Sequence, residues 1–132
     1  MSTEARVAIE RETDIVTARQ SGRELAAGCG FSSTDQTLIA LAISELARNI
    51  VVYAERGEIV MSTALGDRPG IEIIARDHGP GIQDVDLALR DGYSTTKSLG
   101  LGLPGTRRVM DEFEIDSGPG KGTTVTVRKW VR

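Results

Sequence analysis

The sequence is poor in residues that build covalent or metal-linked frameworks. Among its 132 residues it has one cysteine and one histidine. Cys29 alone permits neither a disulfide within this sequence nor a cysteine-based metal cluster. Its place between Gly28 and Gly30 predicts a buried thiol near a helix end. Such cysteine usage suits a compartment that keeps thiols reduced, so we expect a cytoplasmic location.

Long apolar runs and clusters of basic residues are also missing. No stretch approaches the roughly 20 apolar residues of a membrane span, and the start lacks the apolar core of a signal peptide. The net charge of −3 is spread along the chain, so neither a membrane nor a nucleic acid is expected as a partner. The content of 39% hydrophobic and 27% charged residues is typical of one globular domain, here residues 1–132.

Apolar periodicity and turn residues predict the order of the elements. Ile39, Ile43 and Leu46, for example, fall at helical steps of three or four and form a core-facing stripe. The predicted elements are a strand at 6–12, helices at about 13–27 and 35–54, strands at 57–65 and 71–76, a short helix at 84–90, a loop at 91–99, a helix at 104–113, and strands at 114–117 and 123–130. This order predicts an α+β fold, a two-layer sandwich in which helices cover one face of a mixed β-sheet.

Glu45 and Asn49 form the first candidate for chemistry. They stand four residues apart on the second predicted helix, so their side chains leave the same face. An amide oxygen can ligate Mg²⁺, while a carboxylate can orient or deprotonate a hydroxyl group. By itself the pair is more typical of a solvated helix face with an incidental hydrogen bond.

The segment Asp77-His78-Gly79-Pro80-Gly81 directly follows an apolar strand. Two glycines and a proline leave a tight backbone against which a flat ligand can lie, and Asp77 can accept a hydrogen bond from an exocyclic amine such as that of adenine. The same residue types are common in ordinary turns, so the segment alone supports either interpretation.

Two further glycine segments are weaker signals. Gly100-Leu101-Gly102-Leu103 precedes a predicted helix, where backbone N–H groups can bind phosphate. It is neither a dinucleotide fingerprint nor a Walker A motif, because no strand leads into it and no Gly-Lys-Ser/Thr ends it. Gly122-Thr123-Thr124 opens the last strand and by itself indicates a hairpin turn.

The order of these four segments resembles the GHKL ATPase family, which includes gyrase, histidine kinases and MutL. Glu45–Asn49 matches the N box of that family, Asp77–Gly81 its adenine box, Gly100–Gly102 its phosphate box and Gly122–Thr124 its last box. The resemblance implies ATP and Mg²⁺ as cofactors, with Glu45 as general base and Asn49 as metal ligand. The nucleotide-binding residues that it implies are Asn49, Asp77, Gly79, Gly81, Ile82, Gly100, Leu101, Gly102, Leu103 and Thr123. The loop 91–99 would be the ATP lid, in which Lys97 either reaches the phosphates or remains solvated.

Within this family the sequence resembles the bacterial anti-sigma serine/threonine kinases, in particular the stressosome switch kinases. The segments that carry this likeness are Asp14–Val16, Ala18–Gln20, Ile43–Ile50, Asp91–Thr95, Gly102–Gly105, Met110–Phe113 and Lys129–Arg132. The likeness implies phosphorylation of STAS-domain antagonist and co-antagonist proteins of the stressosome, and activation of a PP2C-type phosphatase once the kinase is released. Two alternatives stay open: a module that sequesters a sigma factor with ATP as a structural ligand, and a catalytically idle adaptor that switches a phosphatase.

Overall fold

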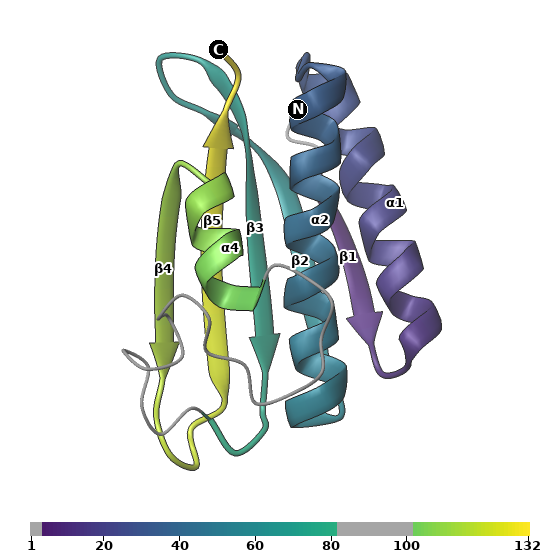
Figure 1. The fold of residues 1–132 in the computed structure, drawn as a ribbon, viewed down its shortest axis with the longest axis vertical. Coiled ribbons are helices and arrows are strands. Elements are labelled where there is room, and N and C mark those ends of the chain that lie inside the picture. Colours follow the sequence, from purple (N-terminus) through teal and green to yellow (C-terminus); the bar gives the residue numbers. More distant parts are fainter. Residues whose placement is uncertain (1–3, 82–101) are drawn as a thin grey trace.

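The computed structural model describes residues 4–81 and 102–132, so the helix predicted at 84–90 and the loop predicted at 91–99 lie outside the described residues. The described strands are β1 (Glu4–Ile9), β2 (Gly57–Leu65), β3 (Pro69–Asp77), β4 (Glu112–Ser117) and β5 (Thr123–Trp130). They form one sheet in the order β1-β2-β3-β5-β4, in which β5 lies between β3 and the edge strand β4 (Figure 1).

Helices cover one face of this sheet (Figure 1). They are α1 (Glu12–Cys29), α2 (Ser33–Asn49) with a π-helical turn η1 (Ile50–Ala54) that continues it, and α4 (Gly102–Val109). The predicted α+β sandwich with helices on one face is therefore confirmed.

The prediction of a mixed sheet is wrong, because every strand pair in the described chain is antiparallel. Short turns join β2 to β3 and β4 to β5, which makes these pairs hairpins. Between β1 and β2 the chain runs up through α1 and down through α2, so β2 starts at the end where β1 stopped (Figure 1). An even number of helical passes therefore gives an antiparallel pair.

The core lies between the sheet and the stripe that α2 presents to it. Ile39, Ile43 and Leu46 are at most 2% exposed, as the helical period predicts. The sheet contributes alternate residues of its central strands, namely Ile59, Met61, Ile71, Ile73, Ala75, Val125 and Val127. Burial of these aliphatic side chains is the main force that holds α2 on the sheet.

Three element boundaries differ from those predicted. The first strand ends at Ile9 rather than Glu12, because Asp14 Oδ2 accepts the backbone N–H groups of Glu10 and Arg11 and so starts α1 earlier. The predicted helix 35–54 changes from α to π geometry after Asn49. The helix predicted at 104–113 begins at Gly102 and ends at Val109, because residues 112–117 pair with β5 as a strand.

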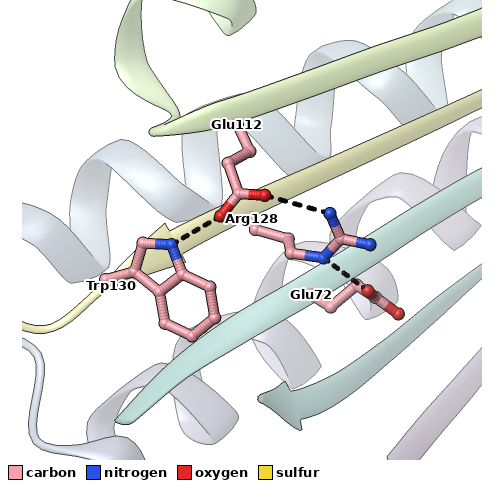
Figure 2. Close-up of polar contacts among 4 residues, drawn as sticks. All are labelled: Glu72, Glu112, Arg128 and Trp130. Carbon is pink, nitrogen blue, oxygen red and sulfur yellow. Dashed lines mark hydrogen bonds and ion pairs between the residues drawn. The ribbon is translucent and has the colours of Figure 1, made fainter. Parts of the chain in front are cut away.

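The opposite face of the sheet carries charged rows instead of helices. Figure 2 shows Arg128 on β5 between two carboxylates: its Nε donates to Glu72 Oε2 at 2.7 Å and its Nη1 to Glu112 Oε1 at 3.1 Å. The Trp130 indole donates to the other oxygen of Glu112. The hydrogen bond with Glu72 is the main reason that the pKa of Arg128 lies above its usual value.

One helix of the described chain, Ser33–Ala54, is long and apolar enough by composition to cross a membrane. Length and composition are weak evidence, because the core helix of a soluble protein meets the same criteria. Here the apolar stripe Ile39, Ile43 and Leu46 lies in the core against the sheet, which accounts for the composition.

Candidate nucleotide site

The ends of several elements meet at one end of the molecule. In Figure 1 the carboxyl ends of β3 and of α2 with η1, together with the turn between β4 and β5, all lie at the lower edge. This edge carries Asp77, Gly79, Gly81 and Thr123, and α2 brings Asn49 toward it. The fold thus gathers three of the four sequence segments, which stand up to about 80 residues apart.

Asp77 is the best-defined polar group at this edge. Its Oδ1 accepts two backbone N–H groups, that of Gly79 at 2.9 Å and that of Thr123 at 3.2 Å. Both bonds use the same oxygen, and the side chain is only half-buried. In the described chain, Oδ2 is therefore the oxygen of Asp77 that a ligand amine can use as an acceptor.

The glycines of this segment are needed for packing. A Cβ on Gly79 would lie 2.6 Å from Ala54 Cβ of η1. Gly81 has a φ of +79°, and a Cβ there would collide with the Gly118 carbonyl oxygen of the β4–β5 turn. The sequence suggested bare backbone beside a ligand, whereas the structure shows backbone in close contact with η1 and with the turn.

Thr123 is held on both sides of its backbone. Its N–H binds Asp77, and its hydroxyl lies 2.8 Å from the Ser117 hydroxyl, which itself donates to the Gly122 carbonyl. Gly122, with a φ of +73°, has no room for a Cβ against the Asp77 carbonyl oxygen. Gly122–Thr124 was the weakest of the four sequence signals, yet its backbone lies directly against Asp77. Only the strand pairing of Asp77 with Thr123 reveals this.

Glu45 and Asn49 lie on α2, as predicted, but Glu45 is not on a solvated face. It is 3% exposed, and among the described residues it is one of three buried polar or charged side chains. Asn49 is half-buried at the last turn of α2. Between them, the Nε of Arg48 is buried without a hydrogen-bond partner in the described chain. The simple solvated-face interpretation of this pair is therefore wrong.

The remaining predicted residues are Ile82, beside the adenine box, and those of the phosphate box and the lid. Gly102 is the first residue of α4 and Leu103 the second, and Leu103 is buried. Ile82, Lys97, Gly100 and Leu101 lie outside the described residues. No described contact joins Glu45 or Asn49 to Asp77, so their joint action on one ligand stays a prediction.

The residues present suit a nucleotide with magnesium. Asp77 offers a fixed acceptor for an amine, and the start of α4 offers backbone N–H groups to an anion. In the described chain no group of three or more His, Cys, Asp or Glu side chains could hold a metal by itself. Mg²⁺ typically needs few protein ligands because phosphate oxygens and waters complete its octahedron. A single amide oxygen from Asn49 fits that pattern.

The sequence matches a known protein family. Residues 9–129 match the model of the histidine kinase-like ATPase domain. The chain belongs to this family. The family is the one that the four sequence segments predicted, and its match spans all the described elements from α1 to most of β5.

Individual relatives indicate which branch of the family this chain resembles. This chain is 48% identical to the serine/threonine-protein kinase RsbT of Bacillus subtilis, over 100% of both chains. It is 34% identical to an anti-sigma F factor of Caldanaerobacter subterraneus, over 70% of this chain and 68% of the relative. The predicted resemblance to anti-sigma serine/threonine kinases is confirmed, and with it the class of enzyme.

Solved structures agree with the fold. The RsbU and RsbW domains of a Mycobacterium tuberculosis protein match with a TM-score of 0.59 at 24% identity, over 98% of this chain and 33% of that one. The mycobacterial sensor histidine kinase MprB matches with a TM-score of 0.57 at 15% identity, over 98% of this chain and 99% of that one. At such identities these structures support the sandwich alone.

Proposed function

We propose that this ATPase domain is a cytoplasmic stress-response kinase that transfers phosphate from Mg-ATP to a serine or threonine of STAS-domain proteins of the stressosome. Once released from them, it activates a PP2C-type phosphatase. The observation that carries the proposal is Glu45, a buried carboxylate one helical turn before Asn49. The full-length likeness to RsbT, which is named a serine/threonine-protein kinase, supports the choice of acceptor.

The adenine of ATP would be recognised at the end of β3. The Asp77 carboxylate keeps Oδ1 on the backbone of Gly79 and Thr123, and its Oδ2 accepts the adenine amine. Because two N–H groups fix the carboxylate, its position does not depend on the ligand. Gly81 allows the close contact of this segment with the Gly118 carbonyl oxygen, and Ile82 would border the adenine.

The phosphates would lie between α2 and the start of α4. Backbone N–H groups from Gly100 to Leu103 would bind them, helped by the positive end of the α4 dipole. Asn49 would ligate Mg²⁺, which when bound neutralises charge on the phosphates. Lys97 would approach the phosphates from the lid.

Glu45 would remove the proton from the acceptor hydroxyl as the oxygen attacks. A positioned base of this kind typically contributes about 10²–10⁴ in rate. Its burial favours that role, since a carboxylate excluded from water interacts more strongly with a hydroxyl than a solvated one does.

A second candidate is sequestration of a sigma factor, which the likeness to anti-sigma F factors favours. Pure sequestration needs bound nucleotide but no base. The deciding experiment incubates the protein with radiolabelled Mg-ATP and the STAS proteins encoded nearby, and maps phosphoserine and phosphothreonine by mass spectrometry. Pull-down with sigma factors runs in parallel. Label on a STAS protein supports the kinase, whereas sigma capture without label favours sequestration.

A further inference from the structure

A buried lysine lies at the opposite end of the sheet from Asp77. Lys129 is 6% exposed and follows Val125 and Val127 in the row of β5 that faces the helices. Lysine is rarely buried this deeply unless its charge is compensated. The position would suit an aliphatic residue, so a charge there needs its own explanation.

The compensation comes from α4. Lys129 Nζ donates a 2.7 Å hydrogen bond to the carbonyl oxygen of Val109, the last residue of that helix. The last carbonyls of a helix have no partner within it and carry its negative partial charge. An ammonium group at this point satisfies one carbonyl and complements the dipole.

The same helix end is held by neighbouring residues of the C-terminal segment. The Asp111 N–H donates to the Arg128 carbonyl at 2.9 Å, and Asp111 Oδ2 accepts the Trp130 N–H at 2.8 Å. Its other oxygen pairs with Arg132. The corner between α4 and β4 is therefore bound to residues 128–132 by side chains and backbone.

We propose that Lys129 is a positioning residue for the phosphate groups of the nucleotide, acting through α4; this inference rests on the proposed function. The helix has eight residues and is about 12 Å from end to end. Lys129 fixes its carboxyl end, and its amino end is Gly102 of the phosphate box. Asp77, which would hold adenine, sits on β3 and does not depend on α4.

The test compares ATP with adenosine, which has the base but lacks phosphates. Lys129→Met keeps the length and the apolar stem but removes the hydrogen bond to Val109. We expect the ratio of the adenosine Kd to the ATP Kd to fall about 10-fold, within the range for hydrogen bonds to charged groups, with adenosine affinity unchanged. Hydrogen exchange of residues 102–109 without nucleotide should also become faster.

Arg128→Met is the matched control. Arg128 is the preceding residue of β5 and is also cationic, but its side chain binds Glu72 and Glu112 on the other face of the sheet. It should lose some stability and keep the affinity ratio. A general loss of stability would not change the ratio selectively, which separates positioning from a structural role.

A folded Lys129→Met variant with the wild-type ratio and wild-type exchange in α4 would overturn the inference. Should that variant not fold, Asp111→Asn weakens the same corner and decides by the same two measurements. Failure of the proposed function is distinguishable, because it would appear in wild-type protein as missing phosphate transfer to STAS proteins, whatever the affinity ratio of the Lys129→Met variant.

Discussion

The Asp77 carboxylate accepts the backbone N–H of Thr123, a residue 46 positions later, at 3.2 Å. The bond joins the last residue of β3 to the first residue of β5, which face each other in the sheet. The Gly79 N–H reaches the same oxygen. Two backbone N–H groups thus orient the carboxylate through Oδ1, so a substitution can keep these two bonds while changing the group at the position of Oδ2.

Asp77→Asn should preserve the fold and weaken ATP binding. Its amide oxygen can replace Oδ1 as acceptor for Gly79 and Thr123, while its NH₂ group then faces the adenine amine, donor against donor. We expect affinity to fall about 10- to 100-fold, measured by calorimetric titration, since hydrogen bonds to charged groups contribute about 1.5–3 kcal/mol.

Asp77→Ala is the companion variant. It removes the acceptor for both N–H groups and should also lower the free energy of unfolding by about 1–3 kcal/mol in denaturant titrations. Wild-type ATP affinity in folded Asp77→Asn would remove Asp77 from the adenine site.

Glu45→Gln should separate binding from transfer. Glutamine keeps the volume of this buried side chain but cannot take a proton, so phosphate transfer to a STAS substrate should fall about 10²–10⁴-fold. ATP affinity should change little, and Glu45→Ala should behave in the same way with lower stability. Single-turnover transfer at saturating ATP checks this, and undiminished transfer would exclude Glu45 as the base.

Gly81→Ala should destabilise the protein by about 2 kcal/mol or more. The positive φ costs a non-glycine residue about 1–2 kcal/mol, and the new methyl group collides with the Gly118 carbonyl. Gly28→Ala is the control, because a Cβ at that helical glycine meets nothing within 4 Å and should stabilise α1 by about 0.5–1 kcal/mol. Equal effects of the two substitutions in thermal unfolding would contradict the packing described for Gly81.

Cys29 should react slowly with thiol reagents. Burial raises the pKa of its thiol above its ordinary value, so less thiolate is present at pH 8 than in a free cysteine. Iodoacetamide labelling should be slower than that of glutathione, and the midpoint of its pH dependence should lie at a higher pH.

The same shift has a consequence for stability. The raised pKa means that the folded protein favours the neutral thiol. The contribution of this thiol to the free energy of unfolding is therefore complete below the ordinary pKa of cysteine and is lost as pH rises through the pKa of Cys29 in the folded protein. Cys29→Ser should remove this alkaline dependence.

Local sequence signals predicted much of the fold. The stripe Ile39, Ile43 and Leu46 placed α2 in the core, and Gly122–Thr124 indicated the hairpin of β4 and β5. The strand directions were beyond these signals, since periodicity states what an element is but not which way its neighbour runs. The exact start of α1, at which Asp14 is the third helical residue, and the early end of α4 depend on particular hydrogen bonds and strand pairs, which composition does not show.

The sequence indicated residues of the candidate site, but not the contacts that hold them in place. Sequence order indicated Asp77, Gly79 and Thr123, whereas the reasons for the glycines came from contacts with Ala54 and Gly118. In the sequence, Lys129 belongs only to the terminal segment that resembles the stressosome kinases. The one sign of its role is a charged residue at a position of β5 that faces the helices. This sign becomes informative only when the end of α4 is known to lie beside it.

The insertion of β5 between β3 and β4 has a consequence for how the protein matures. Its pairing with β3 links residues 70–77 to 123–130, and such non-local contacts form slowly. The Asp77–Thr123 bond exists only after that pairing. In a nascent chain still lacking β5, the Gly79 N–H would be the one remaining of the two backbone groups that hold Asp77 Oδ1. If Asp77 binds adenine as proposed, nucleotide would favour completion of the sheet by mass action. Nucleotide binding would then be coupled to the pairing of β5 with β3.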